Sequence, residues 1–213
     1  MKTENNIVVI GTGAQAKYIK EIDDLNVVAV VRGDREIDEE FKKDLESVEV
    51  LENLESFKKY ASENEIKAIV AVADNRQKEF IVKELEKLNI ELINVIHPKA
   101  VIAKSAKIGR NVLINAGAVI QPYVSIGNGV MIHANVVIDH NSLIEDYVNL
   151  GPGAKLAGWV KVRKGVYVYT GVSVIPNIDI GAHSVVGAGS VVIKDVPANV
   201  KIAGNPAEII NGE

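Results

Sequence analysis

The sequence predicts two parts of different architecture, a small doubly wound α/β domain over residues 1–97 and a parallel β-helix over residues 98–213. Three observations lead to this prediction. Strand-like and helix-like segments alternate in the first part, an aliphatic residue recurs at every sixth position in the second, and the pattern changes near His97-Pro98. Of the 213 residues, 47% are hydrophobic and 24% are charged. This balance is ordinary for a globular protein and excludes a disordered or collagen-like chain.

The first part is expected to contain about four strands and three helices. Apolar runs predict the strands, and segments with helical spacing predict the helices between them. The strands are expected over residues 7–10, 27–31, 67–73 and 92–96, and the helices over about 14–23, 54–62 and 76–88. This alternation in fewer than 100 residues indicates a Rossmann-like parallel sheet with helices on both faces.

The first strand leads into the turn Gly11-Thr12-Gly13-Ala14-Gln15-Ala16. A Gly-x-Gly-x-x-Ala turn between a strand and a helix lets backbone N–H groups approach a phosphate. Asp34 follows Gly11 by 23 residues, which is the separation expected of a ribose-binding carboxylate. No second domain of dehydrogenase type follows, so a nucleotide-linked substrate fits this site better than NAD.

The second part carries a repeat of six residues. Ile, Leu or Val occupies every sixth position from Ile102 to Val192, sixteen times without exception, and a small or β-branched residue follows four positions later each time. Neither the helical nor the strand period explains this spacing. Short strands joined by tight turns, with three hexapeptides to a coil, explain it. Glycines directly after the aliphatic residue, such as Gly109, Gly127 and Gly151, are expected to relax the backbone at the corners.

Composition also excludes several functions. The net charge of −4 argues against a nucleic-acid binder, although basic residues are in excess after His97. With no cysteine, acid–base or nucleophilic chemistry must use His, Ser, Thr, Lys or carboxylates. There is no apolar run long enough to span a membrane and no secretory signal, so a cytoplasmic protein without membrane contact is expected.

The order of the two parts resembles one family of acyltransferases. The segments that carry the resemblance are residues 95–102, 138–140, 151–158, 194–197 and 204–207. The family is that of sialic acid O-acetyltransferase-like, hexapeptide-repeat enzymes, which includes bacterial UDP-4-amino-sugar N-acetyltransferases. The resemblance implies a left-handed β-helix and acetyl transfer from acetyl-CoA to an amine or hydroxyl of a nucleotide-linked sugar. It also implies a homotrimer with sites between subunits and no metal.

The resemblance assigns roles to individual residues of the β-helix. His140 falls on the family's catalytic histidine, a general base, and an imidazole that titrates near neutrality suits this task. Because one coil is three hexapeptides, Pro122 and Gly158 are expected below and above His140. Gly158 matches the residue whose N–H binds the thioester carbonyl oxygen in the family. Thr170 and Ala188 are expected at another corner, where the family lines the pantetheine arm of CoA.

Three positions depart from the family's pattern. Asn141 stands where members usually carry Glu or Asp, so it is expected to orient His140 without stabilising its positive charge. Asn149 stands where others place a histidine near the acyl-CoA, and Gln15 replaces a histidine of the glycine turn. An amine tolerates a weak base better than a hydroxyl does, so these departures favour N-acetylation.

The sugar nucleotide is expected at the carboxyl ends of the first strands. Residues of three segments are candidates for this site because they follow strands. They are Gly11, Gly13 and Gln15, then Asp34 and Arg35, and then Asn75 or Arg76.

Three alternatives remain open from the residues. One is O-acetylation of sialic acid or a related sugar, and another is a non-catalytic β-helix protein that binds a nucleotide sugar. The third is a zinc carbonic anhydrase, which needs three histidines around one metal at a subunit interface. His133 and His140 lie on successive corners, but His183 follows His140 by more than two coils.

Overall fold

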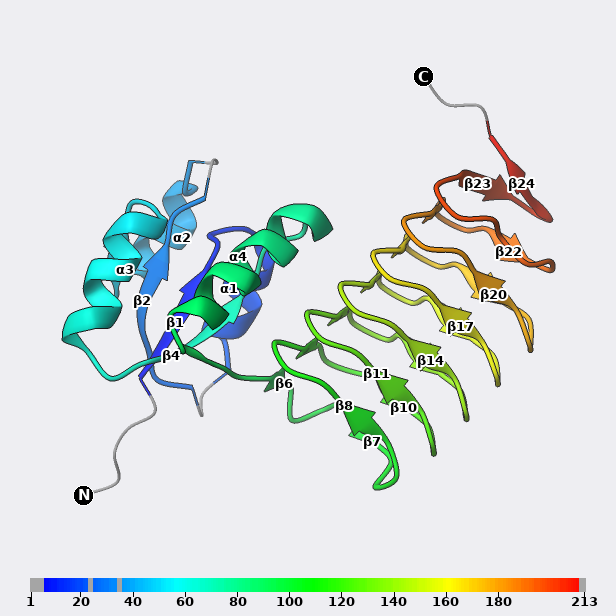
Figure 1. Cartoon of the computed structure of the whole chain (residues 1–213), viewed down its shortest axis with the longest axis horizontal. Coiled ribbons are helices and arrows are strands. Elements are labelled where there is room, and N and C mark those ends of the chain that lie inside the picture. The colour runs from blue at the N-terminus through cyan, green and yellow to red at the C-terminus, as the bar shows by residue number, and fades with distance from the viewer. Residues whose placement is uncertain (1–5, 23–24, 34–35, 211–213) are drawn as a thin grey trace. The chain divides into compact units, whose positions relative to one another are not determined.

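The computed structural model describes residues 6–22, 25–33 and 36–210. The chain divides into two compact units between Val95 and Ile96 (Figure 1). The longest helix in the described residues has 13 residues, and none of these helices is long and apolar enough to cross a membrane.

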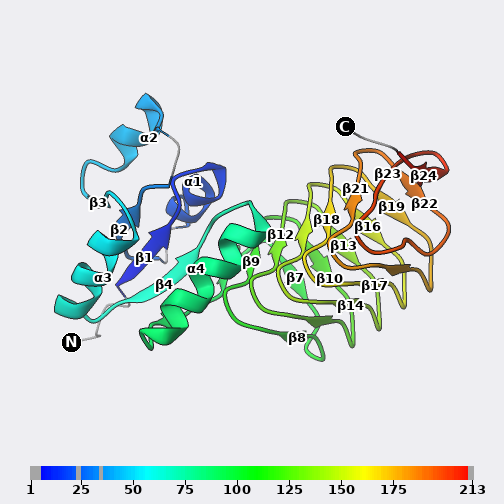
Figure 2. The same cartoon turned by 45° about the horizontal axis from the view of Figure 1, so that its top comes forward.

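The first unit is a parallel sheet with helices on both of its sides (Figure 2). The strand order is β3-β2-β1-β4-β5, so the order reverses between β1 and β4. The strands are β1 (Ile7–Ile10), β2 (Val27–Val31), β3 (Glu49–Leu51), β4 (Lys67–Val70) and β5 (Glu91–Leu92). The helices are α1 (Ala14–Lys20), α2 (Glu39–Asp44), α3 (Leu54–Glu63) and α4 (Asn75–Lys87). The predicted doubly wound fold is confirmed.

Three details of the first unit differ from the prediction. Helix α2 was not expected, because it has only six residues and buries only one of them, Phe41. The sheet has a fifth strand, β3, whose first two residues are exposed, so no continuous apolar run marked it. The predicted strand over residues 92–96 is wrong as one strand. It divides into β5 and a separate strand β6 (Val95–Ile96), which pairs with strands of the second unit.

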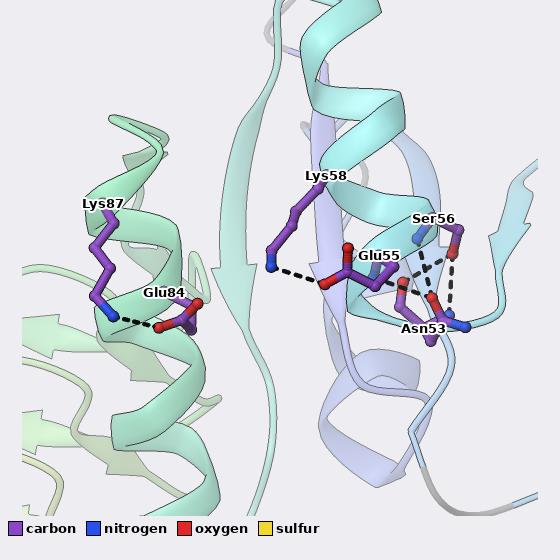
Figure 3. A network of polar contacts seen from close by, with 6 residues as sticks. All are labelled: Asn53, Glu55, Ser56, Lys58, Glu84 and Lys87. Carbon is purple, nitrogen blue, oxygen red and sulfur yellow. Dashed lines mark hydrogen bonds and ion pairs between the residues drawn. The ribbon is translucent and has the colours of Figure 1, made fainter.

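Polar side chains fix the start of α3. Asn53 accepts hydrogen bonds from the backbone N–H groups of Glu55 and Ser56 at 3.0 Å, and the Ser56 hydroxyl accepts one from the Asn53 N–H at 3.0 Å. This reciprocal arrangement satisfies N–H groups that have no partner inside the helix. Figure 3 shows it together with the exposed ion pairs Glu55–Lys58 of α3 and Glu84–Lys87 of α4.

The second unit is a left-handed parallel β-helix, as predicted. Two-residue strands alternate with tight turns and stack into three sheets, here named sheets I, II and III in chain order from β7. Sheet I contains β7 (Val101–Ile102), β10 (Val119–Ile120), β13 (Val137–Ile138), β16 (Lys155–Leu156), β19 (Ser173–Val174) and β22 (Val191–Val192). Sheet II contains β8 (Lys107–Ile108), β11 (Ser125–Ile126), β14 (Leu143–Ile144), β17 (Lys161–Val162) and β20 (Asp179–Ile180). Sheet III contains β6, β9 (Leu113–Ile114), β12 (Met131–Ile132), β15 (Asn149–Leu150), β18 (Tyr167–Val168), β21 (Val185–Val186), β23 (Lys201–Gly204) and β24 (Ala207–Ile209).

The sixfold repeat builds the core of the β-helix. From β7 to β22, each strand pairs in parallel with the strands one coil away, as Ile120 pairs with Ile102 and Ile138. The last strand, β24, pairs antiparallel with β23. The repeated aliphatic residues and the residues four positions after them point inward. The apolar ones among them form one continuous cluster from Val112 to Ile202, and the serines among them, Ser142, Ser184 and Ser190, are also buried. Burying these methyl-bearing side chains at a contribution of about 25 cal/mol per Å² is what holds the short strands together.

The corners lie elsewhere than expected. The left-handed backbone conformation occurs at the third residue after each aliphatic position from Ile108 to Val186, for example at Asn141 with φ 60°. Gly109, Gly127 and Gly151 do not adopt it, so the prediction that they relax the corners is wrong. Instead, a Cβ on any of them would lie within 2.9 Å of backbone atoms of the next coil. These glycines are needed for close stacking of the coils.

Candidate active site

His140 lies at the corner that follows β13, and its side chain is exposed. Its backbone N–H donates to the Asp139 carboxylate at 2.7 Å. Its ring Nδ1 lies 3.0 Å from Oδ1 of Asn141, and the Asn141 N–H donates to the carbonyl oxygen of Pro122 in the coil below at 3.1 Å. The backbone on both sides of the imidazole is therefore fixed.

The contact between His140 and Asn141 decides which ring nitrogen is basic. An amide oxygen only accepts hydrogen bonds, so Nδ1 must carry the proton in this arrangement. The lone pair of the neutral ring then lies on Nε2. The geometry provides a base whose free nitrogen is Nε2.

Gly158 follows β16 and lies one coil above His140. A Cβ on Gly158 would lie 2.8 Å from Cε1 and 2.9 Å from Nε2 of the imidazole, so only glycine leaves room for this ring position. The next residue, Trp159, donates its backbone N–H to the His140 carbonyl oxygen at 3.0 Å. Within the described part of the chain the Gly158 N–H makes no hydrogen bond. This donor remains available beside Nε2.

Trp159 was not among the residues singled out from the sequence. Its indole stands at 89° to the His140 imidazole with the ring centroids 6.4 Å apart, and the residue is 53% exposed. The signal was present in the sequence, because Trp159 follows Asn141 by one whole coil and therefore stacks at the corner of His140.

A shallow groove of about 400 Å³ runs along the outer face of sheet I to this corner. Two of its lining residues, Asp139 and Ala157, directly precede His140 and Gly158. The remaining lining residues are Gln121, Val137, Lys155, Leu156, Ser173 and Val174.

The other predicted residues of the β-helix belong to sheet III and its corner. Thr170 and Ala188 are exposed and stack there on successive coils, because the Gly189 N–H donates to the Thr170 carbonyl oxygen at 2.9 Å. Asn149, in β15, is fully buried, and its Oδ1 lies 3.1 Å from Nε2 of His133. A single chain therefore does not bring Thr170 and Ala188 to the corner of His140.

In the first unit, several predicted residues gather at the carboxyl edge of the sheet. Gly11 follows β1 with φ 118°, and a Cβ there would lie 3.0 Å from the carbonyl oxygen of Ala71 after β4. Gly13 caps α1, Gln15 is buried in its first turn, and Asn75 begins α4. This edge is where the strand order reverses, the usual ligand position in such sheets. The predicted residues Asp34 and Arg35 lie outside the described residues.

Lys78, in the second turn of α4, is fully buried and was not predicted from the sequence. Its Nζ has no hydrogen-bond partner among the described residues. Burial lowers the pKa of Lys78 from 10.5 to about 7, against the opposing effect of the Asp74 carboxylate.

Histidines and carboxylates do not cluster into a metal site in the described part of the chain, where no group of three or more could share an ion. At the corner of His140, the structure instead places the imidazole beside the backbone of Gly158.

Comparison with known proteins agrees with this geometry. Residues 123–158 match the family described as bacterial transferase hexapeptide (six repeats). The chain is also similar to PerB from Caulobacter crescentus, a structure in complex with CoA and GDP-perosamine. They are 31% identical with a TM-score of 0.90, over 97% of this chain and 98% of that one. The chain belongs to the hexapeptide-repeat sugar acetyltransferases.

Other relatives match this chain over different shares of its length. The acetyltransferase domain of PglB from Neisseria gonorrhoeae, in complex with acetyl coenzyme A, is 26% identical over 97% of this chain and all of that one, with a TM-score of 0.84. A serine acetyltransferase of Buchnera aphidicola is 42% identical over 50 residues, 24% of this chain and 18% of that protein. The chain spans about a quarter or less of the length of the first curated relatives. The predicted family and the acyltransferase class are confirmed.

Proposed function

We propose that the chain transfers the acetyl group of acetyl-CoA to the amino group of a nucleotide-linked 4-amino sugar. The observation that carries the proposal is the likeness to PerB over nearly the whole of both chains, because that structure holds CoA and GDP-perosamine. The PglB domain, which holds acetyl coenzyme A, supports the same co-substrate. The corner of His140 supplies the chemistry that this reaction needs.

His140 acts as the general base. The amine nitrogen of the sugar attacks the thioester carbonyl carbon, and Nε2 takes the proton that the nitrogen must lose. The C–S bond then breaks, and the proton passes from His140 to the CoA sulfur. Asn141 holds the proton of the neutral ring on Nδ1, where its Oδ1 accepts a hydrogen bond at 3.0 Å, so that Nε2 is the nitrogen that accepts the proton of the amine and then gives it up.

Gly158 supports the transfer in two ways. Its missing side chain leaves space for the imidazole, since a Cβ would lie 2.9 Å from Nε2. Its N–H, which has no partner in the described residues, donates to the carbonyl oxygen as negative charge develops there.

The neutral partner of His140 favours an amine over a hydroxyl as acceptor. Asn141 orients the ring but adds no negative charge that would stabilise the imidazolium. An amine is a better nucleophile than a hydroxyl and needs less help from a base. Acetylation of a sugar hydroxyl is therefore the less favoured outcome.

In this proposal the two parts of the chain have different functions. Residues 98–213 form the acyltransferase domain, and residues 1–97 bind the nucleotide sugar through the edge that carries Gly11, Gly13, Gln15 and Asn75. Asp34 and Arg35 complete this nucleotide site in the proposal, as their places in the sequence predict.

We also propose a homotrimer with the active site between subunits. His140 lies at the corner after sheet I, whereas Thr170 and Ala188 lie at the corner after sheet III. Two corners of one triangular coil face different directions, so a site that uses both must take one of them from a neighbouring copy. Asn149 joins the CoA side of this site through sheet III. Light scattering at micromolar concentration should give three times 23.0 kDa, and a monomer would contradict the shared site.

The reaction belongs in the cytoplasm, where acetyl-CoA and nucleotide sugars are made.

The decisive experiment offers acetyl-CoA with GDP-, UDP- and dTDP-linked amino sugars and measures free CoA and product mass. A gain of one acetyl group on a 4-amino sugar supports the proposal. His140→Ala should lower turnover by about a hundredfold or more while binding of the sugar nucleotide is kept. If the wild-type protein acetylates a sugar hydroxyl, or binds the sugar nucleotide without any acetyl transfer, the proposed N-acetyltransferase function is refuted.

A further inference from the structure

The corners of the β-helix share one backbone conformation but not one residue type. Fourteen successive turn positions, from Asn111 to Gly189, have φ between 56° and 71°. Ten of them are Gly or Asn, the residues that tolerate this left-handed region best. The other four are aromatic, namely Tyr123, Tyr147, Trp159 and His183.

Packing explains two of the four aromatic residues. Tyr147 lies over Gly129 of the coil below, where a Cβ would be 2.5 Å from its ring, and it is buried. His183 lies over Gly165 in the same way, with a Cβ 2.5 Å from Nδ1. In both cases a ring fills the space that a glycine leaves, and this contact compensates the unfavourable backbone conformation.

Packing does not explain Trp159. The residue one coil below it is Asn141, not glycine, and the indole remains 53% exposed. A bulky aromatic residue at φ 63° with half of its surface in solvent contributes little to stability. Its defined neighbour is the His140 imidazole, with the ring centroids 6.4 Å apart.

This position suits the ring of the acceptor sugar. The reacting amine must lie within about 3 Å of Nε2 to give up its proton. The pyranose that carries the amine then extends a few ångströms further, into the range of an indole whose centroid is 6.4 Å from the imidazole. Aromatic faces pack well against the C–H groups of sugars, and they lose little side-chain entropy in doing so.

We infer that Trp159 is the platform on which the sugar ring of the acceptor rests, and that it determines the affinity for the amino sugar. The inference rests on the proposed function, because it concerns the acceptor side of that same site. The sugar is favoured over CoA as the occupant because Trp159 comes from the corner of the base. The residues proposed to line the pantetheine arm, Thr170 and Ala188, come from another corner.

The chain contains a single tryptophan, so tryptophan fluorescence, excited selectively over that of the tyrosines, reports on Trp159 alone. Titration with GDP-perosamine should change the intensity or emission maximum, whereas GDP, which lacks the sugar, should change neither appreciably. CoA added alone should also leave the emission close to that of the free protein. An equal response to GDP, or a larger response to CoA, would overturn the inference.

Kinetics separate a sugar platform from a structural role. Trp159→Asn introduces the residue that this turn conformation favours, so it should fold at least as well as the wild type. It should raise KM for the amino sugar about tenfold or more, with kcat and the KM for acetyl-CoA changed by less than about threefold. Trp159→Phe, which keeps an aromatic face, should recover most of the loss.

Tyr123→Asn is the matched control, since it removes an exposed aromatic residue from the same turn position two coils below. It should leave both KM values within about twofold of wild type. An unchanged sugar KM in Trp159→Asn, a selective rise in the KM for acetyl-CoA, or loss of the oligomer would each overturn the inference while the function stands. A wild-type protein that acetylates no amino sugar would overturn both.

Discussion

The imidazole of His140 and the amide of Asn141 are joined by a hydrogen bond of 3.0 Å between sequence neighbours. Adjacent residues seldom meet in this way. They do so here because Asn141 occupies the left-handed corner position, with φ 60°, where the chain turns from sheet I toward sheet II. The turn that closes each coil therefore also orients the base.

Asn141 should matter to turnover rather than to binding. Asn141→Gly keeps the backbone conformation and removes only the hydrogen bond, so kcat should fall about tenfold because the ring and its tautomer are no longer fixed. Asn141→Asp keeps the acceptor and adds a negative charge, and its kcat should equal or exceed that of wild type. Steady-state kinetics of the two variants tests this, and a glycine variant with wild-type kcat would remove Asn141 from the mechanism.

Gly158→Ala should displace the imidazole of His140, the proposed base. The added Cβ would lie 2.8 Å from Cε1 of His140, closer than real Cβ atoms come, and Gly158 itself has an ordinary backbone conformation that alanine adopts. We expect kcat to fall by about tenfold or more.

Stability measurements show whether the ring is the cause of this loss. In a His140→Ala background the clash is absent, so Gly158→Ala should then cost little stability. Thermal melts of the four proteins form a double-mutant cycle. Equal destabilisation in both backgrounds would place the clash elsewhere.

The buried amine of Lys78 should lower the stability of the first unit near neutral pH. Because its pKa falls from 10.5 to about 7 on folding, the unfolded chain binds a proton that the folded chain lacks between these values. Stability is therefore lost as pH falls from about 10.5 to about 7. Lys78→Met should raise Tm at pH 7 by roughly 5 °C, and the gain should shrink at pH 10. Circular dichroism melts at both pH values provide the test, and a lower Tm at pH 7 would show that the amine is stabilised by an interaction we have not assigned.

The ion-pair ladder on sheet II should be sensitive to acid. Arg163 donates to Asp179 at 2.8 Å and to Glu145 at 2.9 Å, and its hydrogen bond holds the pKa of Asp179 below the ordinary 3.8. This interaction is complete above about pH 4 and is lost as pH falls through the lowered pKa. The wild type should lose its advantage in Tm over Arg163→Met between pH 5 and pH 2. The control is Lys107→Met, an exposed lysine of the same sheet, whose difference from wild type should not vary with pH in this way.

The fold was predictable because one rule governs half of the chain. Every sixth residue points inward and must be aliphatic, so the period of six is visible in the sequence whatever the local propensities of the other residues. The unbroken series from Ile102 to Val192 shows this. The stacking of Gly158 on His140 follows from the same coil count. The short strand β3 escaped prediction because its pairing with β2 depends on the tertiary sheet, not on its own apolar residues.

The missed features depend on contacts between coils or elements. Gly127 looked like a corner residue, but its role is to let the backbone of the next coil approach. Lys78 stands in a helix whose sequence is mostly polar, and only the packed structure places it in the interior. Trp159 could have been found by the coil count, yet its exposure beside the imidazole could not.

The corner after sheet II also limits how the molecule can change in length. Glycine and an aromatic ring alternate there from Gly129 through Tyr147 and Gly165 to His183. Gaining or losing one coil within this stretch would set ring against ring or glycine against glycine, whereas a change of two coils would keep every pairing. The backbone repeats once per coil, but the side chains at this corner repeat once per two coils. Viable insertions and deletions in this region should therefore come in pairs of coils.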